Sequence, residues 1–413
     1  MNTTKAPFTS YQWLVILILS LTQFSVVLDF MVMSPLGDLL IKNLKITPSQ
    51  FGVVVSSYAL SAGISGFLTA AIADKFDRKK LLLFFYGGFI LGTFLCAIAE
   101  SYSFLVFARI FTGIFGGVMA SISMAIVSDI FTFEQRGRVM GFLQMGFGLS
   151  QILGIPISLY MAAKWGWQSP FYLIVVLAAV IFLAGLFILQ PVNAHLQLQR
   201  DNPLKHMFKT IMNRNYRIGF LATAFMSLGG YLMMPWGSAY AVNNMGVDQK
   251  DLWQLFMYGG IVTFAIMPII GSLSDRWDKF NLFVVASILM VITVLIYTNL
   301  PKVGFWPLMI VNIFMMMGIM ARMVPSQALS TSMPEMADRG AYMSINSSLQ
   351  QVAGGIAAII GGLVVTQKTE ESQLEHFTEL GLIVTAVILI NIFFTKRVYN
   401  FVTSKNENQQ KKA

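Results

Sequence analysis

The sequence predicts an all-α polytopic membrane protein in which twelve transmembrane helices form two six-helix halves. Three observations predict this fold class. Charged residues make up 11% of the chain and apolar residues 56%, whereas a soluble domain carries roughly 25% charged residues. The apolar residues come in blocks of more than about 18, the length at which a helix crosses the hydrocarbon core of a bilayer. A charged stretch in one half also recurs in the other.

The repeated stretch lies at 74–80, between two long apolar runs. Adding 201 to each position carries Asp74 to Asp275 and Asp77 to Asp278, with an aromatic residue between the two carboxylates in both copies. Repetition at about half the chain length indicates a duplicated unit. The chain therefore divides into two similar halves.

The apolar runs predict the helices in order, because each is bounded by short polar or charged connections. We expect helices over 11–38, 49–73, 81–99, 104–130, 139–162, 169–190, 218–242, 251–274, 282–299, 303–330, 341–366 and 373–395. The first block is too long for a signal-peptide core and lacks a small-residue cleavage site, so we expect it to remain as the first span.

The longest connection defines the predicted domains. It is rich in Lys, Arg and His and separates six spans from six. We predict an N-terminal six-helix half at 1–190, a cytoplasmic basic linker at 191–217, a C-terminal six-helix half at 218–395 and a cytoplasmic tail at 396–413.

Positive charge predicts the orientation. Most of the 28 Lys and Arg residues lie in the N-terminus, the loops after the second, fourth, eighth and tenth helices, the linker and the tail. The opposite connections hold isolated lysines such as Lys42 and Lys250. Because cytoplasmic loops are enriched in Lys and Arg, both termini are expected in the cytoplasm. The net charge of +9 therefore indicates topology and does not indicate nucleic-acid binding.

The sequence offers little for metal or nucleotide chemistry. The single cysteine, Cys96, lies in an apolar run, and the three histidines lie in polar connections. This excludes a disulfide framework and a metal site built on Cys or His. No Gly-x-x-x-x-Gly-Lys-Ser/Thr stretch is present to bind phosphates. We expect no cofactor beyond a proton gradient.

The two halves, the basic linker and the repeated loop resemble the major facilitator superfamily across essentially the whole chain. In its signature after the second helix, Gly-x-x-x-Asp-Arg/Lys-x-Gly-Arg-Arg/Lys, residues Asp74, Lys75, Arg78 and Lys79 match. Ala70 and Asp77 replace the two glycines. The resemblance implies two parallel repeats that enclose a substrate site near the bilayer midplane and rock against each other.

The resemblance also implies a gate at the cytoplasmic end. Asp74 would meet the N-terminus of the eleventh helix near Tyr342, where the helix dipole favours an anion, and Arg78 would pair with Asp129. The alternative is that these are solvated charges that only set the topology, which we favour for Lys79 and Lys80. The predicted gate residues are Asp74, Arg78, Asp129, Asp275 and Arg276.

Three ionisable residues lie inside predicted spans: Asp29, Arg109 and Arg322. A charge at the bilayer centre costs at least about 2.5 kcal/mol, and such residues usually face a cavity. Asp29 could exchange protons, because desolvation disfavours its charged form. It could instead be a counter-ion for a cationic substrate, or a structural partner of Arg109. Arg322 either brings a second positive charge to the cavity or is a helix-packing or inner-gate residue near the cytoplasmic end.

Two further stretches resemble signatures of proton-coupled exporters. Arg109 with Gly113 resembles the Arg-x-x-x-Gly signature of the fourth helix, in which the Arg tunes a neighbouring carboxylate. In the fifth helix, Gly148, Gly154 and Pro156 resemble a Gly- and Pro-rich signature, although Ile155 separates the usual Gly-Pro pair. Gly and Pro bend a membrane helix where neighbours satisfy the freed backbone groups. These stretches favour antiport over uptake.

In the resembled fold, helices 1, 4, 7 and 10 line the cavity. Many of the 26 Met residues lie in spans, and flexible thioethers suit varied apolar ligands. Few polar side chains are available, which favours a lipophilic substrate. The candidate wall residues are Gln23, Met33, Thr112, Met119, Tyr231, Met234, Trp236, Asn312 and Met316.

The sequence thus predicts a secondary active transporter similar to bacterial twelve-span drug:proton antiporters and sugar-efflux permeases. It would export a small lipophilic organic molecule in exchange for protons, as a monomer in the lipid bilayer of a bacterial inner membrane, without a nucleic-acid partner. The alternatives are a transporter of the same fold for a sugar, siderophore or lysolipid, with or without proton coupling. More distant alternatives are a polytopic membrane enzyme and a non-transporting sensor.

Overall fold

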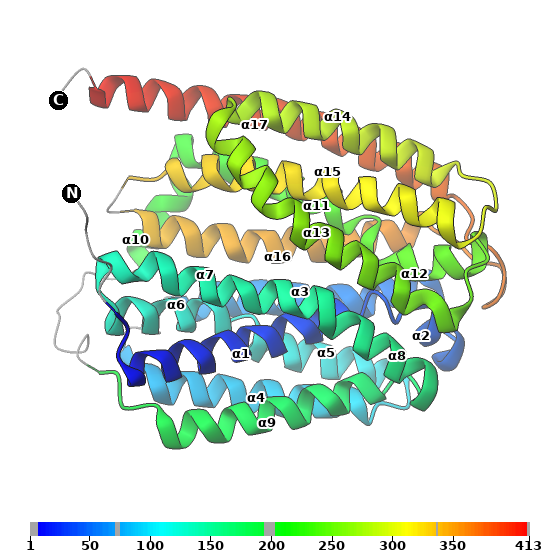
Figure 1. The fold of residues 1–413 in the computed structure, drawn as a ribbon, viewed down its shortest axis with the longest axis horizontal. Coiled ribbons are helices and arrows are strands. Elements are labelled where there is room, and N and C mark those ends of the chain that lie inside the picture. The colour runs from blue at the N-terminus through cyan, green and yellow to red at the C-terminus, as the bar shows by residue number, and fades with distance from the viewer. Residues whose placement is uncertain (1–6, 71–74, 194–202, 336–337, 411–413) are drawn as a thin grey trace.

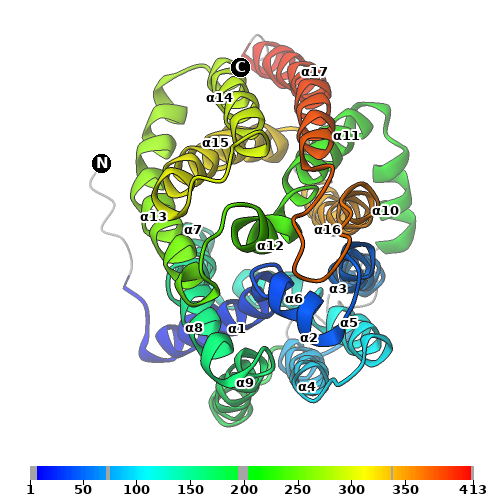
Figure 2. The ribbon, with the colours of Figure 1, turned by 90° about the vertical axis from the view of Figure 1, so that its right-hand side faces the viewer.

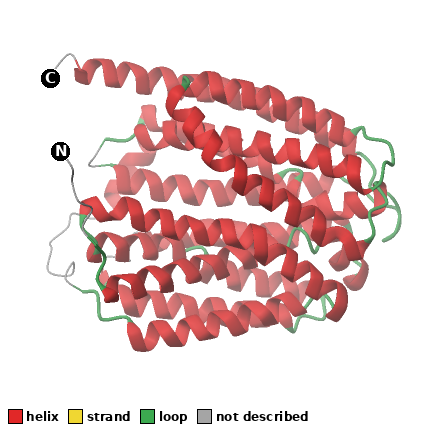
Figure 3. Ribbon diagram, viewed as in Figure 1, coloured by secondary structure: helices red, strands yellow, loops and turns green. Residues whose placement is uncertain are grey.

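The structure is a computed structural model that describes residues 7–70, 75–193, 203–335 and 338–410. The described chain is almost entirely helical (Figure 3), with a single isolated β-bridge between Thr366 and Glu375. Its helices are α1 (Ser10–Val32), α2 (Gly37–Leu44), α3 (Pro48–Ala70), α4 (Arg78–Ala97), α5 (Tyr102–Gly116), α6 (Met119–Ile130), α7 (Phe133–Leu149), η2 (Ser150–Gly154), α8 (Ile155–Trp165), α9 (Ser169–Ile188), α10 (Pro203–Met212), α11 (Arg214–Tyr231), η4 (Met234–Trp236), α12 (Gly237–Ala239), η5 (Tyr240–Asn244), η6 (Gln249–Asp251), α13 (Leu252–Arg276), α14 (Lys279–Thr298), α15 (Phe305–Ser332), α16 (Arg339–Val364) and α17 (Phe377–Gln410).

Twelve helical segments among the described residues are long and apolar enough to cross a membrane, which confirms the predicted number. Several of these spans are interrupted rather than continuous: α5 and α6 share one span, as do α7, η2 and α8. The first helix is shorter than the expected 11–38, because Pro35 cannot donate a backbone hydrogen bond and α1 ends at Val32. Within the expected linker, α10 forms a helix, and α17 runs past the expected end at 395 to Gln410.

The helices gather in two groups. Viewed along the bundle (Figure 2), α1 to α9 lie together on one side and α11 to α17 on the other, with α12 near the centre. The described chain begins and ends at one end of the bundle (Figure 1), here called the termini end. The opposite end, here called the far end, carries α2 and α12. We refer to the two groups as the N-terminal and C-terminal halves.

Among the described residues, the repeated charged loop caps the following helix in the same way in both halves. Asp77 is the N-cap of α4, and its side chain accepts a hydrogen bond from the Lys80 backbone N–H at 3.1 Å. Asp278 is the N-cap of α14 and accepts one from the Asn281 N–H at 2.9 Å. An N-cap carboxylate satisfies a backbone donor that the helix itself leaves free. This explains why Asp stands where the family signature has Gly.

The two halves meet along α3 and α16, where glycines let the backbones approach closely. A Cβ atom at Gly52 would lie 2.6 Å from the Ala358 carbonyl oxygen, and one at Gly63 would lie 2.8 Å from the Ser348 carbonyl oxygen. From the other helix, Gly355 faces Leu60. Small residues at such contacts are typical of membrane helices, because packing rather than hydrophobicity drives their association.

The second contact between the halves is confined to part of the length of the bundle. Gly260 of α13 lies against η2, where a Cβ would approach the Gln151 carbonyl oxygen to 3.2 Å. Towards the termini end, Gly141 of α7 and Gly271 of α13 would each have nothing within 4 Å of an added Cβ. The halves therefore pack closely between η2 and α13, and the two helices have open surroundings nearer the termini.

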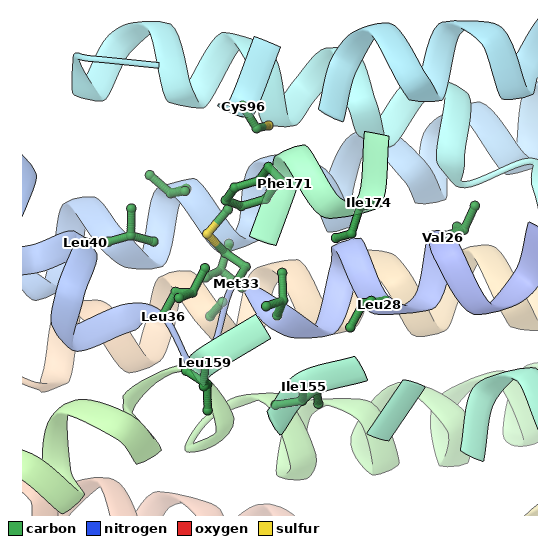
Figure 4. Close-up of a cluster of buried hydrophobic side chains, with 14 of the residues drawn as sticks. Val26, Leu28, Met33, Leu36, Leu40, Cys96, Ile155, Leu159, Phe171 and Ile174 are labelled. Atoms are coloured by element: carbon green, nitrogen blue, oxygen red, sulfur yellow. The ribbon is translucent and has the colours of Figure 1, made fainter. Parts of the chain in front are cut away.

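Much of the interior of the N-terminal half is an apolar cluster. Figure 4 shows Met33, just after α1, close to Phe171 of α9, with Leu159 of α8 and Leu36 near it. All four side chains are buried. This cluster fixes the position of the end of α1, which also carries Asp29.

Adding a methyl group to the α3–α16 contact should destabilise the protein. Gly52→Ala places a Cβ against the backbone of Ala358, so the helices must move apart, at a cost of about 1–3 kcal/mol. We expect a lower midpoint of thermal unfolding in detergent. Gly271→Ala, also within a helix but with open surroundings, is the control and should match or exceed the parent. Equal midpoints for the two variants would contradict the tight contact.

Candidate functional site

An ion pair lies at the centre of the N-terminal half. The Arg109 guanidinium of α5 donates from one terminal nitrogen to Asp29 Oδ2 of α1 at 2.8 Å. Thr93 of α4 donates its hydroxyl to Asp29 Oδ1 at 3.2 Å. Asp29, Arg109 and Thr93 are all 0% exposed. Three helices thus contribute to one buried polar site, and both oxygens of the Asp29 carboxylate are hydrogen-bonded.

The neighbours of this ion pair are aromatic and small. The centre of the Arg109 guanidinium lies 4.5 Å from the centre of the Tyr58 ring of α3. Thr112, one turn after Arg109, donates to the Ala108 carbonyl at 2.7 Å and lies 3.7 Å from Cys96 Sγ. Arg109 Nε is buried without a hydrogen-bond partner among the described residues. The guanidinium is therefore held by one carboxylate and one ring, with the Cys96 thiol beside it.

The structure brings Asp29 and Arg109 together but leaves Arg322 elsewhere. Arg322 of α15 is 2% exposed and donates from Nε to Ser287 Oγ of α14 at 3.1 Å. Its guanidinium lies 5.4 Å from the centre of the Phe283 ring, and it can donate to the side-chain oxygen of Asn391 at 3.2 Å. Among the described residues, no carboxylate lies within ion-pair distance of it. Of the two roles considered for Arg322, its contacts favour packing within the C-terminal half.

One predicted gate contact is present. Arg78 Nε lies 3.2 Å from Asp129 Oδ2, at the termini end of α4 and α6. Both residues belong to the N-terminal half, so this pair does not itself bridge the halves. Asp74 lies outside the described residues, and Asp275 and Arg276 are exposed at the end of α13. The gating role of these residues stays a prediction.

The candidate cavity residues fall into two groups. Four of them are at most 1% exposed and are enclosed by other side chains, so they do not line an open cavity in this structure: Met33, Thr112, Met119 and Trp236. The remaining five are partly exposed or carry a buried polar group. These are Gln23, which donates to Ser123 at 3.2 Å, Tyr231, Met234, Met316 and Asn312, whose buried oxygen has no partner among the described residues.

A π-helical segment lies where the fifth predicted helix carries its Gly and Pro residues. η2 separates α7, which ends beside Gly148, from α8, which has Pro156 in its first turn. Proline lacks the N–H for an α-helical bond, and a π-turn is one way to absorb the irregularity. Gly154 lets this segment pack on Leu28, next to Asp29.

The far end carries a polar cluster that none of the predicted site residues belongs to. Asp38 of α2 is 1% exposed and accepts hydrogen bonds from Lys42 Nζ at 2.9 Å and from Asn243 Nδ2 at 2.7 Å. Lys42 Nζ also donates to Asn243 Oδ1 at 3.2 Å. Nearby, Ser238 donates to the Ser34 carbonyl at 3.1 Å. These contacts tie α2 of one half to η5 and α12 of the other.

A sequence signal for this cluster does exist. Positions 42 and 243 differ by 201, the offset of the internal repeat. Equivalent positions of two parallel repeats can touch only near the axis that relates the repeats. The cluster of Asp38, Lys42 and Asn243 therefore lies on the approximate two-fold axis at the far end, where the halves must separate if that end opens.

Comparisons with known proteins agree with this architecture. A profile described as Major Facilitator Superfamily matches residues 19–358. The uncharacterized MFS-type transporter YbcL of Bacillus subtilis is 24% identical over 379 residues, which cover 92% of this chain and 95% of YbcL. The bicyclomycin resistance protein homolog of Haemophilus influenzae is 25% identical over 385 residues, covering 88% of this chain and 90% of the relative. The crystal structure of a D-xylose-proton symporter has a TM-score of 0.76 at 15% identity, covering 92% of this chain and 97% of that one.

Breaking the far-end cluster should open that end more often. Asn243→Ala removes the hydrogen bonds that Asn243 makes with Asp38 and Lys42, and hydrogen bonds to charged groups contribute about 1.5–3 kcal/mol each. With a Ser238→Cys reporter, we expect a polar maleimide to label the buried thiol roughly tenfold faster or more. Asn244→Ala is the matched control, because Asn244 bonds only to Leu374 within the same half. Equal rates in both backgrounds would show that the cluster does not hold this end closed.

Arg322 and Arg109 should respond differently to replacement by methionine. Arg322→Met removes a buried cation that has no carboxylate partner, so we expect a free energy of unfolding within about 1 kcal/mol of the parent. Arg109→Met leaves Asp29 buried and unpaired, with an expected loss of about 3–5 kcal/mol. Chemical or thermal unfolding in detergent measures both. A folded Arg322→Met protein that no longer transports would instead assign Arg322 a role in the transport cycle.

Proposed function

The chain belongs to the major facilitator superfamily of secondary transporters, and we propose that it couples the inward movement of protons to the efflux of a small lipophilic organic molecule. Protons and substrate would cross at different times, as each half-cycle opens the protein to one side. The termini end is proposed to face the cytoplasm, because it collects most of the basic residues. Family membership makes the chain a transporter and not an enzyme.

The observation that carries the proton-coupling proposal is the buried Asp29–Arg109 ion pair. Asp29 has no exposure in this structure, and its carboxylate is stabilised by Arg109 and Thr93. A carboxylate in such a place has two states. It is either charged and paired with Arg109, or protonated, in which case the pair is broken and Arg109 must find other partners. A change between these states can alter how α1 packs against α4 and α5.

The position of the pair also suits exchange with a substrate. Asp29 is followed by Phe30, whose ring centre lies 5.9 Å from that of Tyr231 in the other half. Movement of α1 around Asp29 would therefore shift Phe30 relative to Tyr231 at the boundary between the halves. We propose that the substrate binds at this boundary. The aromatic and Met side chains there favour an apolar substrate.

The direction of transport is proposed on two grounds. The relative from Haemophilus influenzae is described as a bicyclomycin resistance protein homolog, which supports efflux. The stretch around η2 resembles the fifth-helix signature of exporters, with Pro156 in the first turn of α8.

Removing the Asp29 carboxylate should abolish proton movement. In inverted membrane vesicles holding a pH gradient, we would add lipophilic cations, neutral drugs and sugars and record collapse of the gradient. We expect one class to collapse it with the parent protein, and Asp29→Asn to reduce that collapse at least about tenfold, because Asn cannot carry a proton. Asp248→Asn, at an exposed site, is the control and should behave as the parent.

Asp29→Asn leaves Arg109 buried without its carboxylate, so folding needs its own control. The double variant Asp29→Asn with Arg109→Gln has no unpaired charge and should restore a folded protein without restoring proton movement. If the parent protein exchanges substrate without moving protons, the proposal of proton antiport is wrong and a facilitator mechanism is favoured. Proton movement that survives Asp29→Asn would place the coupling group elsewhere.

A further inference from the structure

The Tyr58 ring is the second partner of the Arg109 guanidinium. The ring centre lies 4.5 Å from the guanidinium carbon, and Tyr58 is 1% exposed. A cation facing an aromatic ring at this distance is attracted by the ring quadrupole, and more strongly where water is excluded. Tyr58 belongs to α3, whereas Asp29 belongs to α1, so the cation is held by groups from two different helices.

These two partners respond differently to protonation. When Asp29 takes up a proton, its negative charge is lost and its attraction for Arg109 falls. The guanidinium then remains in the interior, where an unpaired charge is costly. The Tyr58 ring does not titrate with Asp29, so its attraction for the cation persists. Once the protonated Asp29 no longer competes for the guanidinium, the cation is free to settle more closely over the ring, so the cation–ring attraction strengthens on protonation. This gain lowers the cost of the protonated state relative to the charged state.

The ring, and not the hydroxyl group, is the part of Tyr58 that acts. Within the described part of the chain, the Tyr58 hydroxyl has no hydrogen-bond partner. It lies against Gly116, where an added Cβ would be 2.5 Å from the hydroxyl oxygen. This close approach holds the ring in place. The other side of Tyr58 meets Phe30, with ring centres 5.3 Å apart, and Phe30 in turn meets Tyr231 of the C-terminal half.

Few other titratable groups surround the site. From α4, the Cys96 thiol faces Arg109, and from α11 the Tyr231 phenol faces Tyr58. Thr93 and Thr112 add only hydroxyl groups. No second carboxylate is recorded near the pair among the described residues. Asp29 is therefore the group whose protonation the Tyr58 ring can influence.

We propose that Tyr58 is a positioning residue for proton exchange at Asp29: its ring retains the Arg109 guanidinium when Asp29 is protonated and thereby sets the pH at which the proton binds. This rests on the proposed function, in which Asp29 carries the proton. Through Phe30 and Tyr231, the same ring connects the proton site to the boundary between the halves.

The test needs no transported substrate. In reconstituted membranes, infrared difference spectroscopy follows the carbonyl band of a protonated carboxyl group as the pH is changed, and loss of the band in Asp29→Asn assigns it. We expect Tyr58→Phe to keep the parent midpoint, because the ring is retained. Tyr58→Leu should move the midpoint about one pH unit to lower pH, because protonation becomes more costly without the ring.

A graded series separates the ring quadrupole from packing. Phenylalanine with increasing ring fluorination at position 58 keeps the shape of the ring and weakens its negative face, so the midpoint should fall stepwise. Tyr86 is the matched control: it is buried, stacks on Phe89 and bonds to Ser25, away from Arg109. The same series at Tyr86 should leave the midpoint unchanged.

The outcomes distinguish the two proposals. If the Asp29 band titrates with one midpoint in the parent, in Tyr58→Leu and across the fluorinated series, the role of Tyr58 is overturned while proton binding by Asp29 stands. If no band assignable to Asp29 titrates in the parent, proton carriage by Asp29 fails, and the role of Tyr58 fails with it. A stepwise shift at position 58 alone supports both.

Discussion

The buried ion pair between Asp29 and Arg109 constrains how the helices of the N-terminal half pack. A charge that has left water must be paired and hydrogen-bonded, and here α1, α4 and α5 each supply part of that pairing. The three helices cannot shift independently without leaving a charge unsatisfied. The glycines beside the pair follow from the same constraint, since Gly113 and Gly116 let α5 approach α3 closely enough for Tyr58 to reach Arg109.

The two halves share the caps and glycines of the internal repeat, but their buried charges differ. Asp77 and Asp278 cap equivalent helices, and α3 and α16 contribute glycines to one shared contact. The interior of the C-terminal half instead holds Arg322 against Ser287 and Phe283, and no carboxylate pairs with it among the described residues. Proposed proton chemistry is therefore placed in the N-terminal half. The C-terminal half would then mainly shape the substrate site. Contacts across the boundary between the halves would link proton binding to substrate binding.

The contacts between the halves differ along the bundle. α3 and α16 are tightly packed, with glycine against backbone, whereas the α7–α13 region has open surroundings near the termini end. At the far end, Asp38, Lys42 and Asn243 meet near the axis of the repeat. Polar side chains at such a place can satisfy one another when the halves meet and can be satisfied by water when they part. A purely apolar contact would instead lose free energy when water reached it, so it would oppose opening of this end.

The sequence by itself determined the number of spans, the duplication and the identity of the buried charges, because each of these follows from composition and spacing. The resemblance of its motifs to a known signature indicated the family. The cost of a charge in hydrocarbon was enough to single out Asp29 and Arg109. Only the tertiary structure decided which groups face them, because Tyr58 and Thr93 come from other helices and apolar periodicity does not specify how those helices turn. The enclosure of Met33 and Trp236, the isolation of Arg322 and the cluster at Asp38 likewise depend on packing between distant segments.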